Sequence, residues 1–496
     1  MLSTKKFACA LLAICTVFSS LTFVSCDKDD KESTPAVTVS QENADETEEL
    51  YPDYLPEALD FDKKEITFLV MGDGYNSVDW RSQDIYAETD SDDPIVSAVY
   101  RRNMFLEEEY NVKIREVASD APGTTAQNSI KSGLDEFQVL MCNTASTISL
   151  MQNQLLLDLN SLEYLDLTQP WWDQTMRENC SIAGKNYFAT GDISIMDNDA
   201  TWVMMFNKQL AKNYGFDPYK LVEENNWTFD EMHKMMMTAA NDNGDGVVKW
   251  EDDTFGLSTH HSTCEAFFYA AGLSVTQKDS SDLPYFDATA SHTDYIMRVL
   301  EKSISIWEDE SVLFASDGVV THSEETQEVF ESGRALFLAE VLQLAIRLRE
   351  MDVDFGVLPF PKYQASQKNY GHFVHSTTAL LSIPITCKDK DNVSALVEAM
   401  AAKSMYTLTP AYYDVVLTGK AFRDEESADM LDIILKSRTF DLGGIHMFDW
   451  GNIGSIFPEI VRSGSNNYAS LYKRGISRAT ATMNKDIDKI LSDNPT

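Results

Sequence analysis

Positive charge is scarce in this sequence. Its 496 residues include 40 Lys and Arg against 79 Asp and Glu, which gives a formal net charge of −39. Contacts with nucleic-acid phosphates depend on Lys and Arg, so this balance excludes a nucleic-acid partner. The same deficit argues against direct adhesion to anionic lipid headgroups, whereas high acidity suits an exposed, soluble protein.

Closely spaced cysteine pairs are also missing. The chain has seven Cys, and the four that belong to the predicted folded body are far apart: Cys142, Cys180, Cys264 and Cys387. None of the spacings that bind zinc or support dithiol redox chemistry occurs among them. We expect buried thiols, with one disulfide as the open alternative in an oxidising exterior.

Familiar catalytic motifs are absent as well. The sequence has no G-x-S-x-G elbow, no phosphate-binding loop and no H-E-x-x-H. His260, His261, His372 and His375 match no known metal-site spacing, so we expect loop or hydrogen-bonding roles for them. The sequence therefore favours a protein that is not an enzyme and requires no cofactor. A secreted carbohydrate-active hydrolase remains the alternative, because two facing carboxylates would suffice for it.

The apolar run at the N-terminus predicts export. Lys5 and Lys6 precede an apolar stretch from Phe7 to Val24, which is followed by Ser25 and Cys26. A positive start, a short apolar core and a small residue before the cut are typical of a cleaved secretory signal, here residues 1–25. A core flanked in this way is more often a signal than a membrane-spanning helix.

The end of this signal, Phe23-Val24-Ser25-Cys26, resembles the lipobox of bacterial lipoproteins. That resemblance implies that Cys26 becomes the mature N-terminus and carries a palmitate-containing lipid, which would anchor the exported protein to the outer face of the cell membrane. Phe23 stands where Leu is usual, and an ordinary signal peptide is the alternative.

Residues 26–60 are rich in acids, Ser and Thr and poor in large apolar residues. Such a segment cannot bury enough surface to order itself, so we predict a disordered acidic tether. Signal cleavage removes two Lys and no acid, which leaves a mature charge of 38 − 79 = −41.

The remaining chain predicts an α/β protein with two lobes. With 44% apolar residues it can bury a large core, and single cores stop growing at roughly 250–300 residues. Buried strands alternate with helical patterns, which favours mainly parallel sheets with flanking helices. The expected strands include Glu65–Met71, Val112–Arg115, Phe137–Met141, Thr201–Phe206, Ala335–Leu338, Phe355–Pro359 and Ala379–Pro384.

Several segments resemble signatures of family 1 extracellular solute-binding proteins, the class that includes maltodextrin-binding proteins. The segments lie in family order over about Glu65 to Pro384: Leu157–Leu162, Phe206–Lys208, Trp227–Glu231, Thr254–Leu257, Phe330–Ala335 and Phe355–Lys362. The resemblance implies a type II periplasmic-binding-protein-like fold, in which two lobes joined by a hinge of crossing strands close around a ligand.

The same resemblance implies that the chain crosses between the lobes, so that each lobe is discontinuous. The expected segments are 61–195 for lobe 1, 196–365 for lobe 2, 366–408 for a return to lobe 1 and 409–496 for a helical C-terminal part of lobe 2. It also implies a monomer that delivers a small solute, a mono- or oligosaccharide, to the permease of an ABC transporter. A protein that serves a sensor is the alternative partner assignment.

Candidate ligand contacts follow from position in these sheets. In parallel sheets, ligands bind outside the carboxyl ends of the strands, and sugar sites combine apolar walls with a few polar groups. The candidates after strands or at the predicted crossing are Asp73, Tyr75, Asn143, Thr144, Asp192, Asp199, Trp202, Glu340 and Trp450. For each aromatic residue among them, packing in the core or on the surface is the alternative.

An acidic loop before Thr254 has the spacing of a calcium loop. Hard oxygens on a tightly turning loop are the ligands that calcium prefers. The predicted oxygen donors are Asn241, Asn243, Asp245, the Val247 carbonyl and Asp252, with Gly246 at the turn. The loop is either a structural calcium site or a Gly- and Asn-rich turn with solvated acids.

Overall fold

The computed structural model describes residues 51–56, 59–75, 80–315, 324–348, 351–417, 425–447 and 449–492. The chain divides into a first unit over Met1–Glu48 and a second over Glu49–Thr496. Everything below concerns the second unit. The predicted signal peptide and Cys26 lie outside the described residues.

A four-stranded sheet is built from the first part of the chain and one returning strand. Its order is β12-β3-β1-β2, in which β1 runs parallel to β2 and β3 while β12 runs antiparallel to β3. Its strands are β1 (Glu65–Met71), β2 (Lys113–Ser119), β3 (Val139–Asn143) and β12 (Ala379–Ser382). The apolar run of β3 is buried along its whole length, as expected for a strand covered on both faces.

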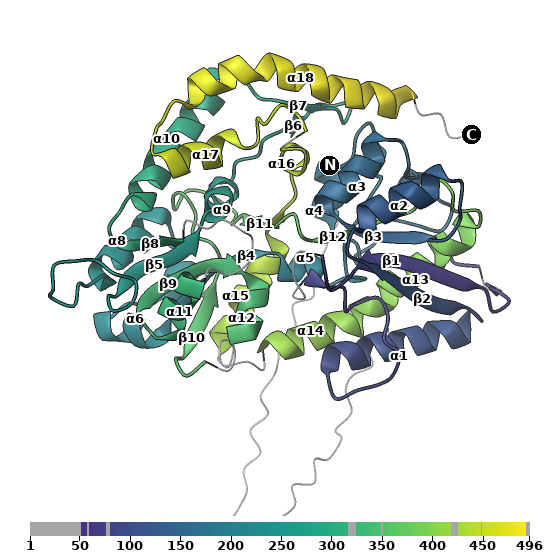
Figure 1. The fold of residues 1–496 in the computed structure, drawn as a ribbon, viewed down its shortest axis with the longest axis horizontal. Coiled ribbons are helices and arrows are strands. Elements are labelled where there is room, and N and C mark those ends of the chain that lie inside the picture. Colours follow the sequence, from purple (N-terminus) through teal and green to yellow (C-terminus); the bar gives the residue numbers. More distant parts are fainter. Residues whose placement is uncertain are drawn as a thin grey trace, which may run out of the picture. The chain divides into compact units, whose positions relative to one another are not determined.

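Helices cover this first sheet on both sides. Figure 1 shows α2 (Pro122–Lys131) and α3 (Thr144–Gln152) on one side of the sheet and α1 (Pro94–Glu109) on the other. Helix α13 (Lys390–Met405) packs on α1. The start of α1 is fixed by Asp93, whose side chain accepts hydrogen bonds from two backbone N–H groups.

The second sheet of the fold has five strands. Its order is β10-β4-β9-β5-β8, in which β5 runs parallel to β8 and β9, whereas β4 runs antiparallel to β9 and β10. The predicted mainly parallel lobe is thus a mixed sheet. Its strands are β4 (Trp202–Asn207), β5 (Phe255–His260), β8 (Val312–Ala315), β9 (Ala335–Val341) and β10 (Phe355–Leu358).

Helices also surround the second sheet. Thr228 caps α8, where its side chain accepts a hydrogen bond from the Glu231 N–H. These helices are α6 (Lys208–Tyr214), α7 (Pro218–Glu223), α8 (Phe229–Ala239), α9 (Thr263–Ala270), α10 (Ala290–Trp307), α11 (Glu324–Glu331) and α12 (Leu342–Arg347). A short hairpin follows α9, formed by β6 (Gln277–Lys278) and β7 (Pro284–Tyr285).

Several segments connect the two sheets. Residues around α5 (Met196–Asp199) lead into β4, and Thr201 pairs with Val374 in an isolated bridge. Strand β11 (His372–Phe373) pairs in parallel with β13 (Arg438–Thr439). Helix α14 (Leu408–Leu417) contacts both α1 beside the first sheet and α12 beside the second. The chain therefore passes from the first sheet to the second before β4 and returns before β12.

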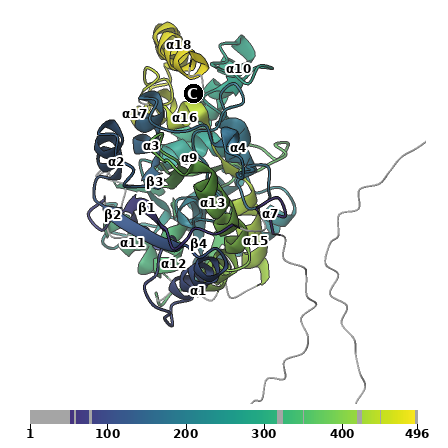
Figure 2. The same ribbon diagram turned by 90° about the vertical axis from the view of Figure 1, so that its right-hand side faces the viewer.

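The C-terminal helices contact elements around both sheets. Helices α15 (Glu425–Lys436), α16 (Leu442–Ile445) and α17 (Ile456–Ser463) lead to α18 (Tyr468–Ser492). Helix α18 packs on α17 and α10 (Figure 1; Figure 2 gives the view at right angles). Farther along α18, Asp486 accepts a hydrogen bond of 3.2 Å from the Gln152 amide at the end of α3. Helix α18 thus touches α10 beside the second sheet and α3 beside the first.

The folded body begins before residue 61, which corrects the predicted extent of the tether. Tyr51 and Tyr110 share a hydrogen bond of 2.5 Å between their hydroxyls, and Leu59 is buried. Tyr54 donates a hydrogen bond to the buried Glu398 of α13. Glu398 also accepts the indole N–H of Trp171 at 3.0 Å and that of Trp172 at 2.9 Å. Both Trp therefore pack within the first lobe.

Candidate ligand-binding cavity

A cavity of about 240 Å³ lies between the carboxyl edges of the two sheets. Helix α3 after β3, α4 (Gln174–Asn179), α9 after β5, the segment after β11 and the segment around α16 all supply wall residues. The lining residues are Thr144, Ala145, Met176, His261, Ser262, Glu265, Tyr269, Phe373, Val374, His375, Ser376, Thr378, Thr439, Phe440, Asp441, Gly444, Ile445 and Met447.

One wall of the cavity is aromatic. The rings of Tyr269 and Phe373 stack with centroids 5.4 Å apart and an angle of 6° between their planes. Gly444 lies against this pair, because a Cβ at that position would lie 1.9 Å from the Tyr269 hydroxyl. A side chain at Gly444 would therefore push Tyr269 out of its place in the wall.

Asp441 holds the segment that carries this wall. Its carboxylate accepts hydrogen bonds from three backbone N–H groups, those of Val275 at 2.5 Å, Thr276 at 3.2 Å and Gly443 at 3.1 Å. It also accepts one from the Thr276 hydroxyl at 2.9 Å. Burial raises the pKa of Asp441, while these four hydrogen bonds favour the ionised form. The carboxylate caps α16 and ties it to the loop after α9.

A buried His–Glu pair supports the cavity from behind. Strands β5 and β9 are parallel with a register that places Ser258 beside Leu338, so His260 lies opposite Glu340. The imidazole Nε2 is 2.8 Å from the Glu340 carboxylate. Burial alone would lower the pKa of His260, but the Glu340 charge raises it above its ordinary value. Trp202 packs edge-on against the ring at 5.1 Å between centroids.

Three buried polar atoms of the cavity wall have no hydrogen-bond partner among the described residues. They are the His261 Nδ1, the Glu265 Oε2 and the Thr378 Oγ1. Burial, with a contribution from His260, lowers the pKa of His261 to about 4, whereas burial raises the pKa of Glu265 to about 7. Buried polar atoms are normally satisfied, so this wall has hydrogen-bonding capacity left for a ligand.

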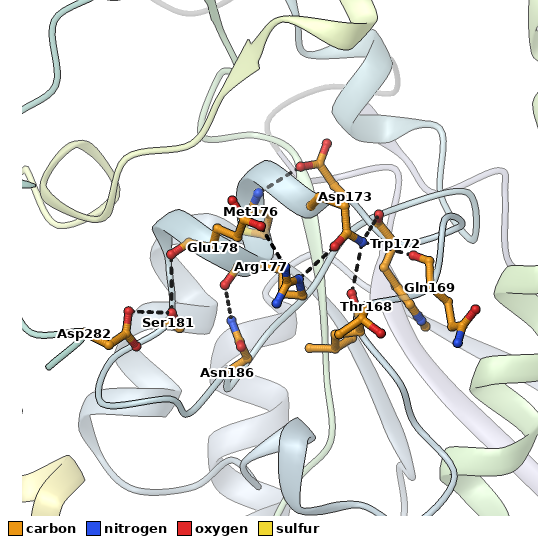
Figure 3. A network of polar contacts seen from close by, with 12 residues as sticks. Thr168, Gln169, Trp172, Asp173, Met176, Arg177, Glu178, Ser181, Asn186 and Asp282 are labelled. Carbon is orange, nitrogen blue, oxygen red and sulfur yellow. Dashed lines mark hydrogen bonds and ion pairs between the residues drawn. The ribbon is translucent and has the colours of Figure 1, made fainter. Parts of the chain in front are cut away.

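Helix α4, which supplies Met176, is fixed at both ends. Figure 3 shows Asp173 at its start, where the carboxylate accepts the Met176 N–H at 2.8 Å. The second Asp173 oxygen pairs with the largely buried side chain of Arg438 in β13 at 2.8 Å. Beyond the helix, Ser181 donates to Asp282 at 3.1 Å, next to the β6–β7 hairpin (Figure 3). This network places Met176 in the cavity wall.

The structure places one of the predicted contacts, Thr144, at the cavity and three others beside it. Thr144 lines the cavity, and its N–H donates to the Ser376 carbonyl. Glu340 lies behind the wall, paired with His260. Asn143 caps α3, and its side chain bonds the Tyr75 hydroxyl. The expectation that ligands bind outside the carboxyl ends of the strands thus pointed to this edge of the first sheet.

The other predicted contacts lie away from the cavity wall. Asp73 is exposed and pairs with Arg81, and Trp202 is buried behind His260. Asp192 accepts the Thr409 hydroxyl at 2.6 Å, and Asp199 accepts the Tyr412 hydroxyl at 2.9 Å. These two Asp bind residues of α14, so they hold the crossing segments together.

Trp450 does not line this cavity, and a ligand contact at this residue stays a prediction. The indole is buried, stacks on His446 at 4.0 Å and donates a hydrogen bond of 3.0 Å to Asp486 of α18. The ring therefore belongs to the packing beneath α18, which is the alternative noted for every aromatic candidate.

The acidic loop is folded by its own hydrogen bonds. Asp253 accepts the Asn243 N–H at 2.9 Å and the Lys249 N–H at 2.6 Å, and Asp242 accepts the Gly244 N–H at 2.7 Å. The Lys249 ammonium pairs with Asp245 at 2.7 Å. No group of three or more His, Cys, Asp or Glu is arranged to hold a metal ion within the described ranges. The predicted calcium ion stays a prediction.

The polar groups that face the cavity from α9 were not among the sequence candidates. The missed residues are Glu265 and Tyr269 on α9 and Phe373, His375 and Thr378 near β11. His261 directly follows the end of β5, so a search of the carboxyl ends of the strands could have found it. Cys142, Cys180, Cys264 and Cys387 are buried free thiols, which agrees with the expectation for them.

Comparison with known proteins identifies the architecture. No protein-family model matches the sequence, and no curated protein matches it either. Among solved structures, UspC of Mycobacterium tuberculosis matches with a TM-score of 0.53 and 13% identity, covering 84% of this chain and 100% of that one. The chain has the fold of the two-lobed solute-binding proteins.

Other solute-binding proteins give the same result. A family 1 extracellular solute-binding protein from Bifidobacterium longum subsp. infantis matches with a TM-score of 0.52 and 15% identity, over 84% of this chain and 99% of that chain. A maltose/maltodextrin-binding domain from Bdellovibrio bacteriovorus, bound to maltotriose, matches with a TM-score of 0.51 and 12% identity, over 86% of this chain and 100% of that chain. The solute-binding fold implied by the sequence is confirmed.

Proposed function

We propose that this protein captures a small carbohydrate in the cavity between its two sheets and delivers it unaltered to an ABC-type importer. The observation that supports this function most directly is the cavity itself, which opens at the carboxyl edges of both sheets of a solute-binding fold. The stacked Tyr269 and Phe373 rings offer an apolar face for a sugar ring. Glu265 and Thr378 offer unpaired oxygens for hydroxyl groups.

A ligand that touches both lobes favours the state in which they are close together, by the difference in its affinity for the two states. The cavity wall suits such a mechanism, because Thr144 and Met176 come from the side of the first sheet, whereas Glu265 and Tyr269 come from α9 of the second. An importer that recognises the closed state would distinguish the loaded protein from the empty one.

The proposed location is the outer face of the cell membrane, with the lipid on Cys26 as the anchor. None of the described helices is long and apolar enough to cross a bilayer. Partition into detergent and mass spectrometry of the N-terminal peptide test the anchor, with Cys26→Ser as the control variant. Recovery of an unmodified Cys26 from membranes of the expressing bacterium would contradict it.

The experiment that tests the function is a thermal-shift screen against mono- and oligosaccharides, followed by calorimetric titration. We expect one sugar or a related group to raise Tm saturably. Phe373→Leu removes the stacked ring and should weaken binding, whereas Phe286→Leu, in the core outside the cavity, should not. Product analysis after long incubation should return the sugar unchanged. Hydrolysis by the pure protein, or equal effects of both substitutions, would refute the proposal.

A further inference from the structure

The charged side chains of the cavity wall are carboxylates. Among the described residues that line the cavity, the carboxylates are Glu265 and Asp441, and none is Lys or Arg. Asp441 is already satisfied by five hydrogen bonds, one of them from the Tyr269 hydroxyl. Glu265 differs, because its Oε2 is buried and has no hydrogen-bond partner in the part of the chain that the structure describes. One acceptor of the wall is therefore open to a ligand, and nothing in the wall neutralises an anionic ligand.

Glu265 is held in place by its position on α9. It lies in the first turn of that helix, and its own backbone N–H is bonded to the Ser262 carbonyl. The next turn carries Tyr269, whose ring stacks on Phe373. The carboxylate and the aromatic wall thus project from one helix face, as residues four apart do. A sugar stacked on the ring would present an edge to Glu265.

We infer that Glu265 makes the cavity selective for ligands that donate a hydrogen bond to its carboxylate, neutral or amino sugars, and that it excludes acidic sugars such as uronates. This inference rests on the proposed carbohydrate function. A hydroxyl or ammonium group satisfies the open acceptor, and hydrogen bonds to a charged partner are among the strongest in proteins. A ligand carboxylate would instead meet Glu265 in a buried wall without a cation.

The surroundings of Glu265 make this preference depend on pH. Burial raises its pKa to about 7, and this is opposed only in part by a hydrogen bond with its own backbone and by the charges of Arg462 on α17 and His260 on β5. A proton on the carboxyl group competes with a donor from the ligand. Binding of a donor sugar should therefore release a proton to solvent, and affinity should fall about tenfold between pH 8 and pH 6.

Other titratable groups also lie near Glu265 and bear on the pH dependence. Burial lowers the pKa of both His261 and His375 to about 4, below this pH window. The remaining groups that face Glu265 or its partners are Cys264, Tyr269, Glu340 and Asp441. Because the pKa of His260 is raised by Glu340, a variant at Glu265 is needed to assign the pH dependence.

The test compares the full mature protein with Glu265→Gln and with Glu108→Gln, which alters an exposed Glu of α1. The ligands are glucose, glucosamine and glucuronate, and galactose with its amino and uronate forms, titrated by calorimetry at pH 6, 7 and 8. We expect the neutral and amino sugars of at least one series to bind at least tenfold more tightly than the uronate at pH 8. Glu265→Gln should narrow that gap and abolish the pH dependence, while Glu108→Gln should keep both.

The outcomes separate this inference from the function on which it rests. A uronate that binds as tightly as its neutral sugar, or a pH dependence that persists in Glu265→Gln, overturns the inference alone. Absence of binding by all six sugars counts against the proposed function and therefore against the inference as well. Circular dichroism and Tm of Glu265→Gln establish that it folds, and Glu265→Asp, which keeps the charge, should still exclude the uronate.

Discussion

His372 predicts a specific acid sensitivity of this fold. The residue is fully buried in β11, and its Nε2 accepts the Phe360 N–H at 3.0 Å. Its Nδ1 is 2.9 Å from the Ser437 hydroxyl, which itself donates to the Ile433 carbonyl. The Nδ1 therefore carries the proton, and the Nε2 must stay unprotonated. Burial accordingly lowers the pKa of His372 from 6.5 to about 3.

The sign and size of the effect follow from these two pKa values. Because the folded pKa is depressed, the contribution of His372 to stability is complete above pH 6.5 and is lost as the pH falls toward 3. In the unfolded chain this site is about half protonated at pH 6.5 and almost fully protonated at pH 5, whereas in the folded chain it stays almost unprotonated over the same interval. The free energy of unfolding should fall by about 1.7 kcal/mol on this account alone.

The assay is urea unfolding, followed by tryptophan fluorescence, at pH 6.5 and pH 5. His372→Gln retains an acceptor and a donor without a titrating ring, so it should lose about 1.7 kcal/mol less than the wild type over this interval. His292→Gln, at a partly exposed site on α10, serves as the matched control. Parallel losses in the wild type and His372→Gln would refute the reasoning.

Three further predictions concern buried charges. Glu398→Gln leaves buried N–H donors without an acceptor and should lower the free energy of unfolding in urea by about 2–4 kcal/mol. Tyr54→Phe removes only one donor and should lower it by about 1 kcal/mol, so equal costs would contradict this account. Asp253→Ala leaves two loop N–H groups without an acceptor and should lower the free energy of unfolding by about 2 kcal/mol, whereas Asp252→Ala at the exposed neighbour should change it little. Calcium titration of both variants, after chelation, tests the predicted ion. Arg438→Met leaves two buried carboxylates unpaired and should cost about 3–5 kcal/mol, and Arg438→Lys should cost less.

Much of the sheet structure could be predicted from the sequence. The strands β1, β3, β4, β9 and β10 are runs of apolar residues bounded by turn residues or helix caps, and each begins within two residues of its expected start. Local pattern suffices for such strands, since a buried strand has to be apolar throughout. The direction of β4 did not follow, because parallel and antiparallel pairing use the same residues.

The candidate site was predictable only where one strand end determines it. Thr144 follows β3 directly, so the rule for sheet edges located it. Glu265 and Thr378 come from a helix and a crossing segment, and only the tertiary fold brings them to one cavity. The packing of Trp450 beneath α18 likewise depends on the tertiary fold, since its partner Asp486 lies 36 residues farther along the chain.

Helix α18 bears on how long a bound solute stays. One part of this helix packs on α17 and α10, while Asp486 and Lys489 near its end hold Gln152 of α3. Any swing that separates α3 from α9 must break these contacts or bend the helix. The residence time of the solute would then be governed from the far end of the chain, so exchange kinetics belong among the properties to measure in C-terminal variants.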